Sequence, residues 1–270
     1  MSDTPGQVGD FVTITREGAV AQVTLDRGDP LNRLSLQAMR ELKRAAEILR
    51  EDADVSAIVL TGAQAFCAGA DLTDPEMAAR EAMTEVEQRN ALRLGPEMCE
   101  AWAKIEAITI AAIEGFCIGG GLALAASCDH RVAASDAHVR LPEVPLGMNM
   151  SWRSVPRLVA LIGPARAKEL IVLGRKVEAQ EALNWGLIDR MTAPGDALST
   201  AHNLASDYAK LPPLAARMAK EAIEVSAHAL AHATSHMDRD QFMLARQSDD
   251  HKEALAAFLE KREPKFVKGH

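Results

Sequence analysis

The sequence predicts an α/β fold that gives way to a helical C-terminal region. Short runs of apolar and β-branched residues alternate with helical patterns in the first part of the chain, and from about residue 197 onward the pattern is almost wholly helical. The chain has 270 residues, of which 48% are hydrophobic, so it can bury a sizeable core. A loop containing Pro194 and Gly195 separates the two parts. We therefore predict a core over residues 1–195 and a helical region over 196–270.

The first predicted elements are a hairpin, a capped helix and a strand. Residues 11–16 and 19–25 are apolar and β-branched runs on either side of a Glu-Gly pair, which predicts two antiparallel strands. Ser35 precedes apolar residues at helical spacing, so it is expected to cap an amphipathic helix. The apolar run Ala57–Leu60 predicts a buried strand.

Residues 74–107 have a helical pattern that is expected to break at Gly95-Pro96. The first half of this segment is charged, which predicts a mobile lid or a solvated surface segment.

The second half of the core repeats the alternation of strands and helices. Thr109–Ile113, Arg131–Ala134 and Val139–Leu141 are expected to be strands, and Leu122–Ser127 is expected to be helical. Ser151 is expected to cap a helix that runs through Leu161 and stops at Gly163-Pro164. Two further short helices are predicted at 165–173 and 178–184, and the helical C-terminal part is interrupted at 211–213.

Composition and charge argue against several classes of protein. The net charge is −8 and the pI is about 5.5, which is not the footprint of a nucleic-acid-binding protein. The longest apolar runs are too short to cross a membrane, and the N-terminus has no secretory pattern. No cysteine pair has Cys-x-x-Cys spacing, so we expect buried free thiols in a reducing cytoplasm. The four cysteines are Cys67, Cys99, Cys117 and Cys128.

Three histidines recur every four residues, at 228, 232 and 236, on one face of a predicted helix. Such spacing can bind zinc, but nothing nearby supplies the other ligands. We expect a solvated helix face and no metal.

Two loops rich in glycine each follow a predicted strand. Gly119, Gly120 and Gly121 separate the strand Thr109–Ile113 from the next helical run, and Thr61–Leu72 follows the strand Ala57–Leu60. Glycine lets a ligand approach the backbone, and the first turn of a helix has N–H groups without internal acceptors. Two such loops can supply two N–H donors to one oxygen, which is an oxyanion hole.

The motifs in these loops and elsewhere resemble the crotonase (enoyl-CoA hydratase/isomerase) superfamily. The resemblance covers roughly residues 10–266, with the motifs in the family's order. They are Leu25–Asn32, Phe66–Leu72, Gly119–Gly121, Asn184–Ile188 and Phe258–Arg262. The resemblance implies a spiral of ββα units, and a C-terminal helical region that mediates oligomerisation, as a homotrimer or a dimer of trimers, and completes the CoA site.

The resemblance also implies the chemistry. The family stabilises the enolate of an acyl-CoA thioester, which is its substrate, and uses no permanently bound cofactor. By alignment, the oxyanion donors are the N–H groups of Ala70 and Gly120. Glu143 falls where the family places a catalytic glutamate, and its apolar neighbours are expected to raise its pKa towards neutrality.

The sequence departs from the hydratase pattern at a second acid/base position. Hydratases of the family have a glutamate where this chain has Ala123, and dienoyl isomerases have an aspartate where it has Ser151. One carboxylate suffices for a 1,3-proton shift, which favours double-bond isomerisation over hydration. Hydration of a 2-enoyl-CoA remains the close alternative. Thioester or C–C cleavage, a non-catalytic role and an RNA-binding role are the more distant ones.

The remaining site residues are expected to contact the acyl chain or CoA. Asp29 stands where a lysine is common, and Arg33 is expected to compensate for the lost charge. Asn149 and Ser151 are candidates to hydrogen-bond a substrate or a water, and Trp152 to shape the acyl pocket. The full set of predicted contacts is Arg27, Asp29, Leu31, Ala68, Asp71, Leu72, Gly119, Ala123, Asn149, Ser151, Trp152, Lys261 and Phe266.

Overall fold

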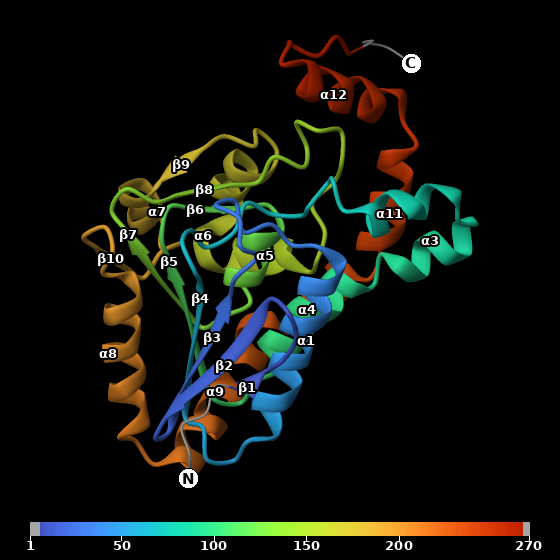
Figure 1. The fold of residues 1–270 in the computed structure, drawn as a ribbon. Helices are drawn as coiled ribbons and strands as arrows, with labels where there is room; N and C mark the ends of the chain where they lie inside the picture. The colour runs from blue at the N-terminus through green and yellow to red at the C-terminus, as the bar shows by residue number, and fades with distance from the viewer. Residues whose placement is uncertain (1–5, 267–270) are drawn as a thin grey trace.

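The computed structural model describes residues 6–266, and within them it has an α/β fold built on two sheets (Figure 1). The larger sheet has the strand order β1-β2-β3-β4-β5-β7-β10, and the smaller one has the order β6-β8-β9. The larger sheet comprises β1 (Gly6–Gln7), β2 (Val12–Glu17), β3 (Val20–Leu25), β4 (Ala57–Gly62), β5 (Ile108–Ile113), β7 (His130–Ala134) and β10 (Arg190–Thr192). The smaller sheet comprises β6 (Phe116–Ile118), β8 (His138–Arg140) and β9 (Val177–Glu178).

Every strand predicted from the sequence is present. β2 and β3 form the antiparallel hairpin, and β3, β4, β5, β7 and β10 then pair in parallel. Parallel neighbours require crossover connections, so helices separate most of these strands in the sequence. The sequence therefore specified the alternation of strands and helices, as the α/β prediction required.

The helices between the strands share one hydrophobic core with one face of the larger sheet. The main helices of this part are α1 (Leu36–Glu51), α4 (Leu94–Ala103), α5 (Gly120–Ala125), α6 (Ser154–Ile171) and α7 (Ala179–Trp185). Ser35 caps α1 as predicted, because its hydroxyl accepts a hydrogen bond from the N–H of Ala38. Trp102 on α4 is fully buried and donates its indole N–H to the carbonyl of Leu42 on α1 (3.1 Å).

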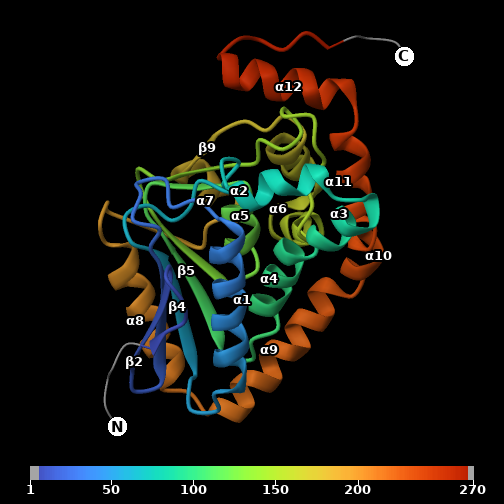
Figure 2. The same ribbon diagram turned by 45° about the vertical axis from the view of Figure 1, so that its right-hand side comes forward.

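The opposite face of the sheet is covered by α8 (Ala197–Ala209), which lies against β4, β5 and β7 (Figures 1 and 2). Successive residues of a strand point to opposite faces, and β4 follows this rule. Ile58 and Leu60 join the core under α1 and α4, whereas Ala57 and Val59 join a second core with Ala201 and other residues of α8. The sheet is therefore buried on both sides. The boundary predicted at 195/196 stays a prediction.

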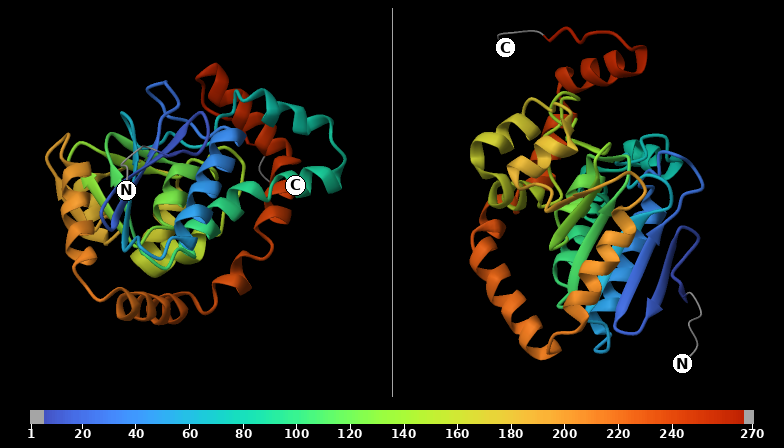
Figure 3. Two further views of the ribbon diagram at one scale, coloured as in Figure 1. Left: turned by 60° about the horizontal axis from the view of Figure 1, so that its bottom comes forward. Right: turned by 90° about the vertical axis from the view of Figure 1, so that its left-hand side faces the viewer.

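The rest of the C-terminal region is helical, as predicted. It comprises α9 (Pro213–His228), α10 (Ala231–Ser235), α11 (Asp238–Arg246) and α12 (Asp249–Glu260). After α9 the chain continues through α10 and α11 to α12, which projects beyond the core (Figure 3). Several large apolar side chains of this region are exposed. They are Leu214, Met218, Ile223, Val225, Leu230, Leu244, Phe258 and Leu259.

Two predicted helix boundaries are wrong. Residues 74–107 form α2 (Pro75–Ala78), the short 3-10 helix η1 (Ala79–Ala82), α3 (Glu85–Ala91) and α4, with no break at Gly95-Pro96. Proline is tolerated in the first turn of a helix, where its missing N–H would have no intrahelical acceptor, and Pro96 occupies that turn of α4. The helical segments are instead interrupted at residues 83–84 and 92–93.

Ser151 does not cap α6. That helix begins at Ser154, and its first flanking residue, Arg153, makes no side-chain capping bond. The carbonyl of Ser151 accepts a hydrogen bond from the Ser154 hydroxyl (2.7 Å). The predicted stop at Gly163 is confirmed, because its φ of 74° and ψ of 164° are not helical and α6 consists of two helical segments that meet there at a kink.

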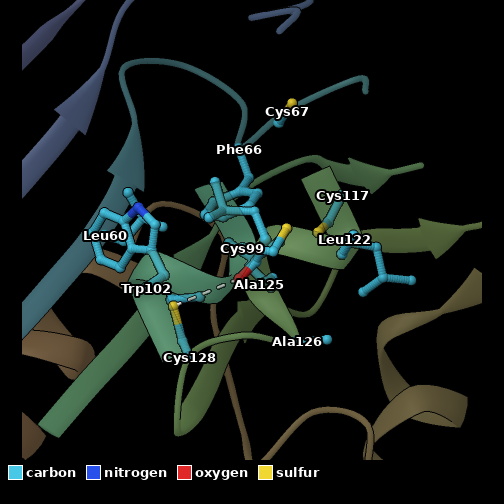
Figure 4. Close-up of a cluster of buried hydrophobic side chains, with 14 of the residues drawn as sticks. Leu60, Phe66, Cys67, Cys99, Trp102, Cys117, Leu122, Ala125, Ala126 and Cys128 are labelled. Atoms are coloured by element: carbon cyan, nitrogen blue, oxygen red, sulfur yellow. Dashed lines mark hydrogen bonds between the residues drawn. The ribbon is translucent and has the colours of Figure 1, made fainter. Parts of the chain in front are cut away.

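The four cysteines are buried and free, as predicted. Figure 4 shows them around Phe66, Leu122 and Trp102. Burial raises the pKa of the thiols of Cys67, Cys99 and Cys128 to about 12, and that of Cys117 well above its ordinary value. The thiolate is the nucleophilic form, so these residues are packing residues.

Within residues 6–266, no helix is both long and apolar enough to cross a bilayer. The same residues contain no group of three or more histidine, cysteine, aspartate or glutamate side chains placed to hold a metal ion. Of the three spaced histidines, His228 lies 3.6 Å from the carboxylate of Glu224, and the side chain of His232 lies outside the described part of the structure.

Candidate active site

The two glycine-containing loops lie side by side. The N–H of Cys67 donates to the carbonyl of Phe116 (3.1 Å), and the N–H of Ile118 donates back to the carbonyl of Cys67 (3.0 Å). This short parallel pairing joins the loop after β4 to β6. Gly69 and Gly119 then turn at positive φ, 92° and 53°, which glycine adopts without strain. The two loops therefore present consecutive backbone groups to the same space.

Ala70 and Gly120 carry the predicted N–H donors. Among residues 6–266, neither N–H has a hydrogen-bond acceptor, whereas that of Gly119 donates to the carbonyl of Arg140 (2.9 Å). A Cβ atom placed on Gly69 would lie 3.6 Å from the nitrogen of Gly120, so the two loops approach closely here. Two free N–H groups on adjacent loops can stabilise charge on one oxygen without reorganisation.

Glu143 lies beside these donors. It follows β8 in the turn that leads to α6, and its Oε1 would lie 2.9 Å from a Cβ atom on Gly119. The residue is partly exposed through its other atoms, but its Oε2 is buried and has no hydrogen-bond partner. Burial raises the pKa of Glu143 to about 7. The predicted direction of the pKa shift is confirmed, and a carboxyl group with this pKa can give and accept protons near neutrality.

At the two positions where the resemblance would allow a second carboxylate, the described structure has Ala123, fully buried on α5, and Ser151, also buried. The cause that raises the pKa of Glu143 is burial, and no charged side chain among the described residues contributes to it. The arrangement therefore has one acid/base group.

Asn149, Ser151 and Trp152 lie in the loop between Glu143 and α6. The side-chain N–H of Asn149 donates to Gln241 on α11 (3.3 Å), and its Oδ1 is buried without a partner. The indole of Trp152 fills the space over Gly120 and reaches Gly95 on α4. Trp152 is thus a wall beside one of the two free N–H groups.

The predicted CoA loop is held together by a buried carboxylate. Asp71 lies 3.5 Å from the guanidinium of Arg27 and 3.2 Å from that of Arg33. Burial alone would raise the pKa of Asp71, but hydrogen bonds from Thr73 and the two arginines lower it. The guanidinium of Arg27 also stacks on the ring of Phe11, 4.4 Å from its centre. The two cations are therefore fixed in place next to the loop.

Asp29 shapes this loop. Its Oδ1 accepts hydrogen bonds from the N–H groups of Leu31 (2.9 Å) and Asn32 (3.1 Å). The carbonyl of Leu31 in turn accepts from the N–H of Ala68, so the predicted CoA residues of the two segments are adjacent. The side chains of Leu31 and Leu72 are 45% and 55% exposed, which leaves an apolar surface available to a ligand.

Lys261 and Phe266 lie at and beyond the end of α12, which projects from the body of the chain (Figures 1 and 3). Lys261 ends the helix in the left-handed conformation, and Phe266 is exposed. Contact of these residues with a ligand stays a prediction.

Two residues that shape the site were missed by the sequence analysis. Gly95 accommodates the indole of Trp152, and Asp238 on α11 accepts a hydrogen bond from the N–H of Arg153 (2.9 Å). A glycine inside a helical pattern is a signal of close approach, and it had been interpreted as a break. Asp238 gave no local signal, because it lies 85 residues from its partner.

The fold and the geometry define a class: an α/β enzyme that can hold an oxyanion on two backbone N–H groups beside one carboxyl group. The family profile described as enoyl-CoA hydratase/isomerase matches residues 15–269, and the chain belongs to this family, the crotonase superfamily.

Relatives support the same assignment. The chain is 35% identical over 262 residues to a probable enoyl-CoA hydratase of Mycobacterium bovis, with 96% of this chain and 98% of the relative covered. It is 33% identical to a short-chain-enoyl-CoA hydratase of Clostridium acetobutylicum, with 93% and 95% covered. A solved enoyl-CoA hydratase/isomerase from Pseudoalteromonas atlantica superposes with a TM-score of 0.84 at 26% identity, covering 96% of this chain and all of that one (100%).

Proposed function

We propose that this enzyme acts on an enoyl-CoA thioester through an enolate that is stabilised by the N–H groups of Ala70 and Gly120. The observation that carries the proposal is the unpartnered, buried Oε2 of Glu143 beside two backbone N–H groups that also lack acceptors. Buried polar groups normally have hydrogen-bond partners, and exceptions mark groups kept free for a ligand. CoA belongs to the substrate in this proposal, and no permanently bound cofactor takes part.

The reaction favoured by one carboxylate is migration of a double bond. The carboxylate of Glu143 takes a proton from C2 of a 3-enoyl thioester, and the electron pair moves to the thioester oxygen and forms the enolate. The protonated Glu143 then returns the proton to C4 as the double bond forms between C2 and C3. The same group serves as base and acid, and a pKa of about 7 suits both roles.

Hydration of a 2-enoyl thioester is the second candidate, because the relatives are named as hydratases. In this reaction Glu143 would activate the attacking water without a second acid/base group. Alternatively, a water held by Asn149 or Ser151 would replace the missing group. Loss of one positioned acid/base group typically lowers a rate about 10²–10⁴-fold, so this route is expected to be slow here.

The test compares the purified protein on a 3-enoyl-CoA and on the matching 2-enoyl-CoA, with migration and water addition followed separately. The proposal expects migration with negligible hydration. Fast hydration without migration would overturn the choice of isomerisation. Activity on neither substrate would contradict the enolate proposal itself.

We also propose that copies of this chain assemble through the C-terminal helices, as a homotrimer or a dimer of trimers. The support is the exposed apolar side chains of α9, α11 and α12, which a monomer would leave in water. Sedimentation of the purified protein tests this assembly, and a monomer at micromolar concentration would contradict it.

A further inference from the structure

The indole of Trp152 occupies a space that two glycines leave open. A Cβ atom added at Gly120 would overlap Cζ3 and Cη2 of the ring, and one added at Gly95 would overlap Cε2. The ring therefore spans from the first residue of α5 to the first turn of α4. It contacts the backbone of Gly120, whose N–H is one of the two free donors.

Glu143 and Trp152 border neighbouring glycines. The carboxyl of Glu143 faces Gly119, and the indole of Trp152 faces Gly120. A thioester oxygen on the N–H of Gly120, with its α-carbon next to Glu143, would place the acyl chain in the space that these two side chains bound. Trp152 is the larger and more apolar of these two side chains, so it is the one that an apolar acyl chain would contact.

The backbone at Trp152 adopts an uncommon conformation. Trp152 and Arg153 have φ values of 59° and 57°, in the left-handed region. Neither residue is glycine, asparagine or aspartate, so the conformation is strained and must be held by its surroundings. The backbone conformation sets the direction in which the indole leaves the chain.

Two carboxylates hold this turn through Arg153. Asp238 on α11 accepts a hydrogen bond from the N–H of Arg153 (2.9 Å), and Asp238 is only 6% exposed. The guanidinium of Arg153 pairs with Glu100 on α4 (3.1 Å). The turn is thus tied to the C-terminal region on one side and to the helix that receives the indole on the other.

We propose that Trp152 is the specificity-determining residue that closes the acyl pocket, that the substrate class is short-chain enoyl thioesters, and that Asp238 is a positioning residue for the Trp152 turn. The inference rests on the proposed function, and it deepens that function by naming the acyl chain that fits. A hydrophobic pocket discriminates about 10–200-fold for each methylene group that it admits or rejects.

The main experiment measures the ratio of kcat/KM on four-carbon and ten-carbon substrates, for the reaction that the wild type catalyses. The wild type is expected to prefer the short chain, and Trp152→Ala to shift the ratio towards the long chain by at least about tenfold. Trp152→Phe keeps most of the ring and is expected to shift it less. The ratio does not depend on the fraction of active protein. An unchanged ratio in Trp152→Ala would overturn the proposal.

Binding of saturated butyryl-CoA and decanoyl-CoA, measured by calorimetry, gives a readout that does not need turnover. If the wild type has no activity but its preference for butyryl-CoA disappears in Trp152→Ala, the proposed reaction fails and the pocket assignment stands. If the wild type is active, but the ratio of the affinities for butyryl-CoA and decanoyl-CoA is the same in the wild type and in Trp152→Ala, the pocket assignment fails and the reaction stands.

Gly95 provides a matched test that leaves the catalytic groups untouched. Gly95 has an ordinary helical backbone conformation, so Gly95→Ala introduces a methyl group whose main collision is with the indole. Gly95→Ala is expected to change the chain-length ratio several-fold in the wild type and less than about twofold in the Trp152→Ala background. Equal changes in both backgrounds would show that the ring does not transmit the effect, which would overturn the proposed packing.

Asp238 is tested by a pair of variants. Asp238→Ala removes the acceptor for the N–H of Arg153, and the ratio is expected to move in the same direction as in Trp152→Ala. Asp238→Asn keeps an amide oxygen that can accept the bond, and is expected to restore the wild-type ratio. If both variants leave the ratio unchanged, Asp238 is not a positioning residue.

Discussion

Glu41 and Glu143 both have buried carboxyl oxygens, and the surroundings of the two side chains differ. Glu41 on α1 accepts hydrogen bonds from the backbone N–H groups of Asp10, Phe11 and Val12, and from the side chain of Gln37. Glu143 has an Oε2 with no partner at all among the described residues. Glu41 thus ties the start of β2 to α1, whereas Glu143 makes no comparable bond to the rest of the fold.

The comparison separates burial from function. Desolvation makes any buried carboxylate unfavourable, and donors compensate for that loss. At Glu41 the donors are present, so the group contributes to folding. At Glu143 Oε2 has no donor, and burial outweighs the one hydrogen bond from the residue's own backbone, so the pKa rises to about 7. An unsatisfied group, and not merely a buried one, is the mark of acid/base chemistry here.

The largest effect is expected from Glu143→Gln. Removal of the only acid/base group should lower kcat by about 10²–10⁴-fold and leave the affinity for the CoA thioester nearly unchanged. Steady-state kinetics and calorimetric binding measure the two quantities. Turnover at the wild-type rate would show that another group carries the protons.

The same substitution at Glu41 should have the opposite profile. Glu41→Gln replaces one accepting oxygen with an amide N–H group and leaves backbone donors without a partner, so the free energy of unfolding should fall by about 2–3 kcal/mol. The activity of the folded protein should stay as in the wild type. Urea denaturation and kinetics check both, and an unchanged unfolding midpoint would mean that the β2 contacts contribute little.

Stability as a function of pH provides a third contrast. The pKa of Glu143 is raised in the folded state from 4.5 to about 7, so its contribution to stability is present below pH 4.5 and is lost as the pH rises through 7. Glu143→Gln does not lose that contribution. The stability of the variant relative to the wild type should therefore be about 3 kcal/mol higher at pH 8 than at pH 4. Denaturation at the two pH values measures the gain, and a pH-independent difference would contradict it.

The smallest effect is expected at Ser35, which caps the helix that carries Glu41. Ser35→Ala removes an acceptor for the N–H of Ala38 and should lower the free energy of unfolding by about 1 kcal/mol, without changing kcat/KM. The variant separates the contribution of the helix from that of Glu41. A loss as large as that of Glu41→Gln would mean that the helix end, and not the buried carboxylate, limits stability in this region.

Sequence patterns were sufficient where the local physics is strong. Alternating and continuous apolar runs located the strands, and Ser35 marked the start of α1. The two glycine-containing loops indicated a pair of backbone donors, whereas Glu143 was identified by the resemblance to the family and not by its local sequence. Each of the local signals depends on a few neighbouring residues.

The parts that could not be predicted depend on contacts between distant residues. The left-handed turn at Trp152 and Arg153 has no local signature, because neither residue favours that conformation alone. Its support comes from Asp238 and from Glu100, which lie on α11 and α4. Gly95 was interpreted as the end of a helix, although the space beside it is needed for an indole. Ser151 looked like a cap because only tertiary structure showed that the helix begins later.

The position of α8 has a consequence for synthesis of the protein. β4, β5 and β7 leave the ribosome well before Ala197–Ala209, the segment that covers their second face. Until that helix emerges, Val59, Ile110 and Val132 have no partner on that side, and a nascent chain of fewer than about 200 residues presents an apolar sheet to its surroundings. The nascent sheet is therefore a surface for chaperones, and a ribosome that stalls before α8 leaves a chain prone to aggregate.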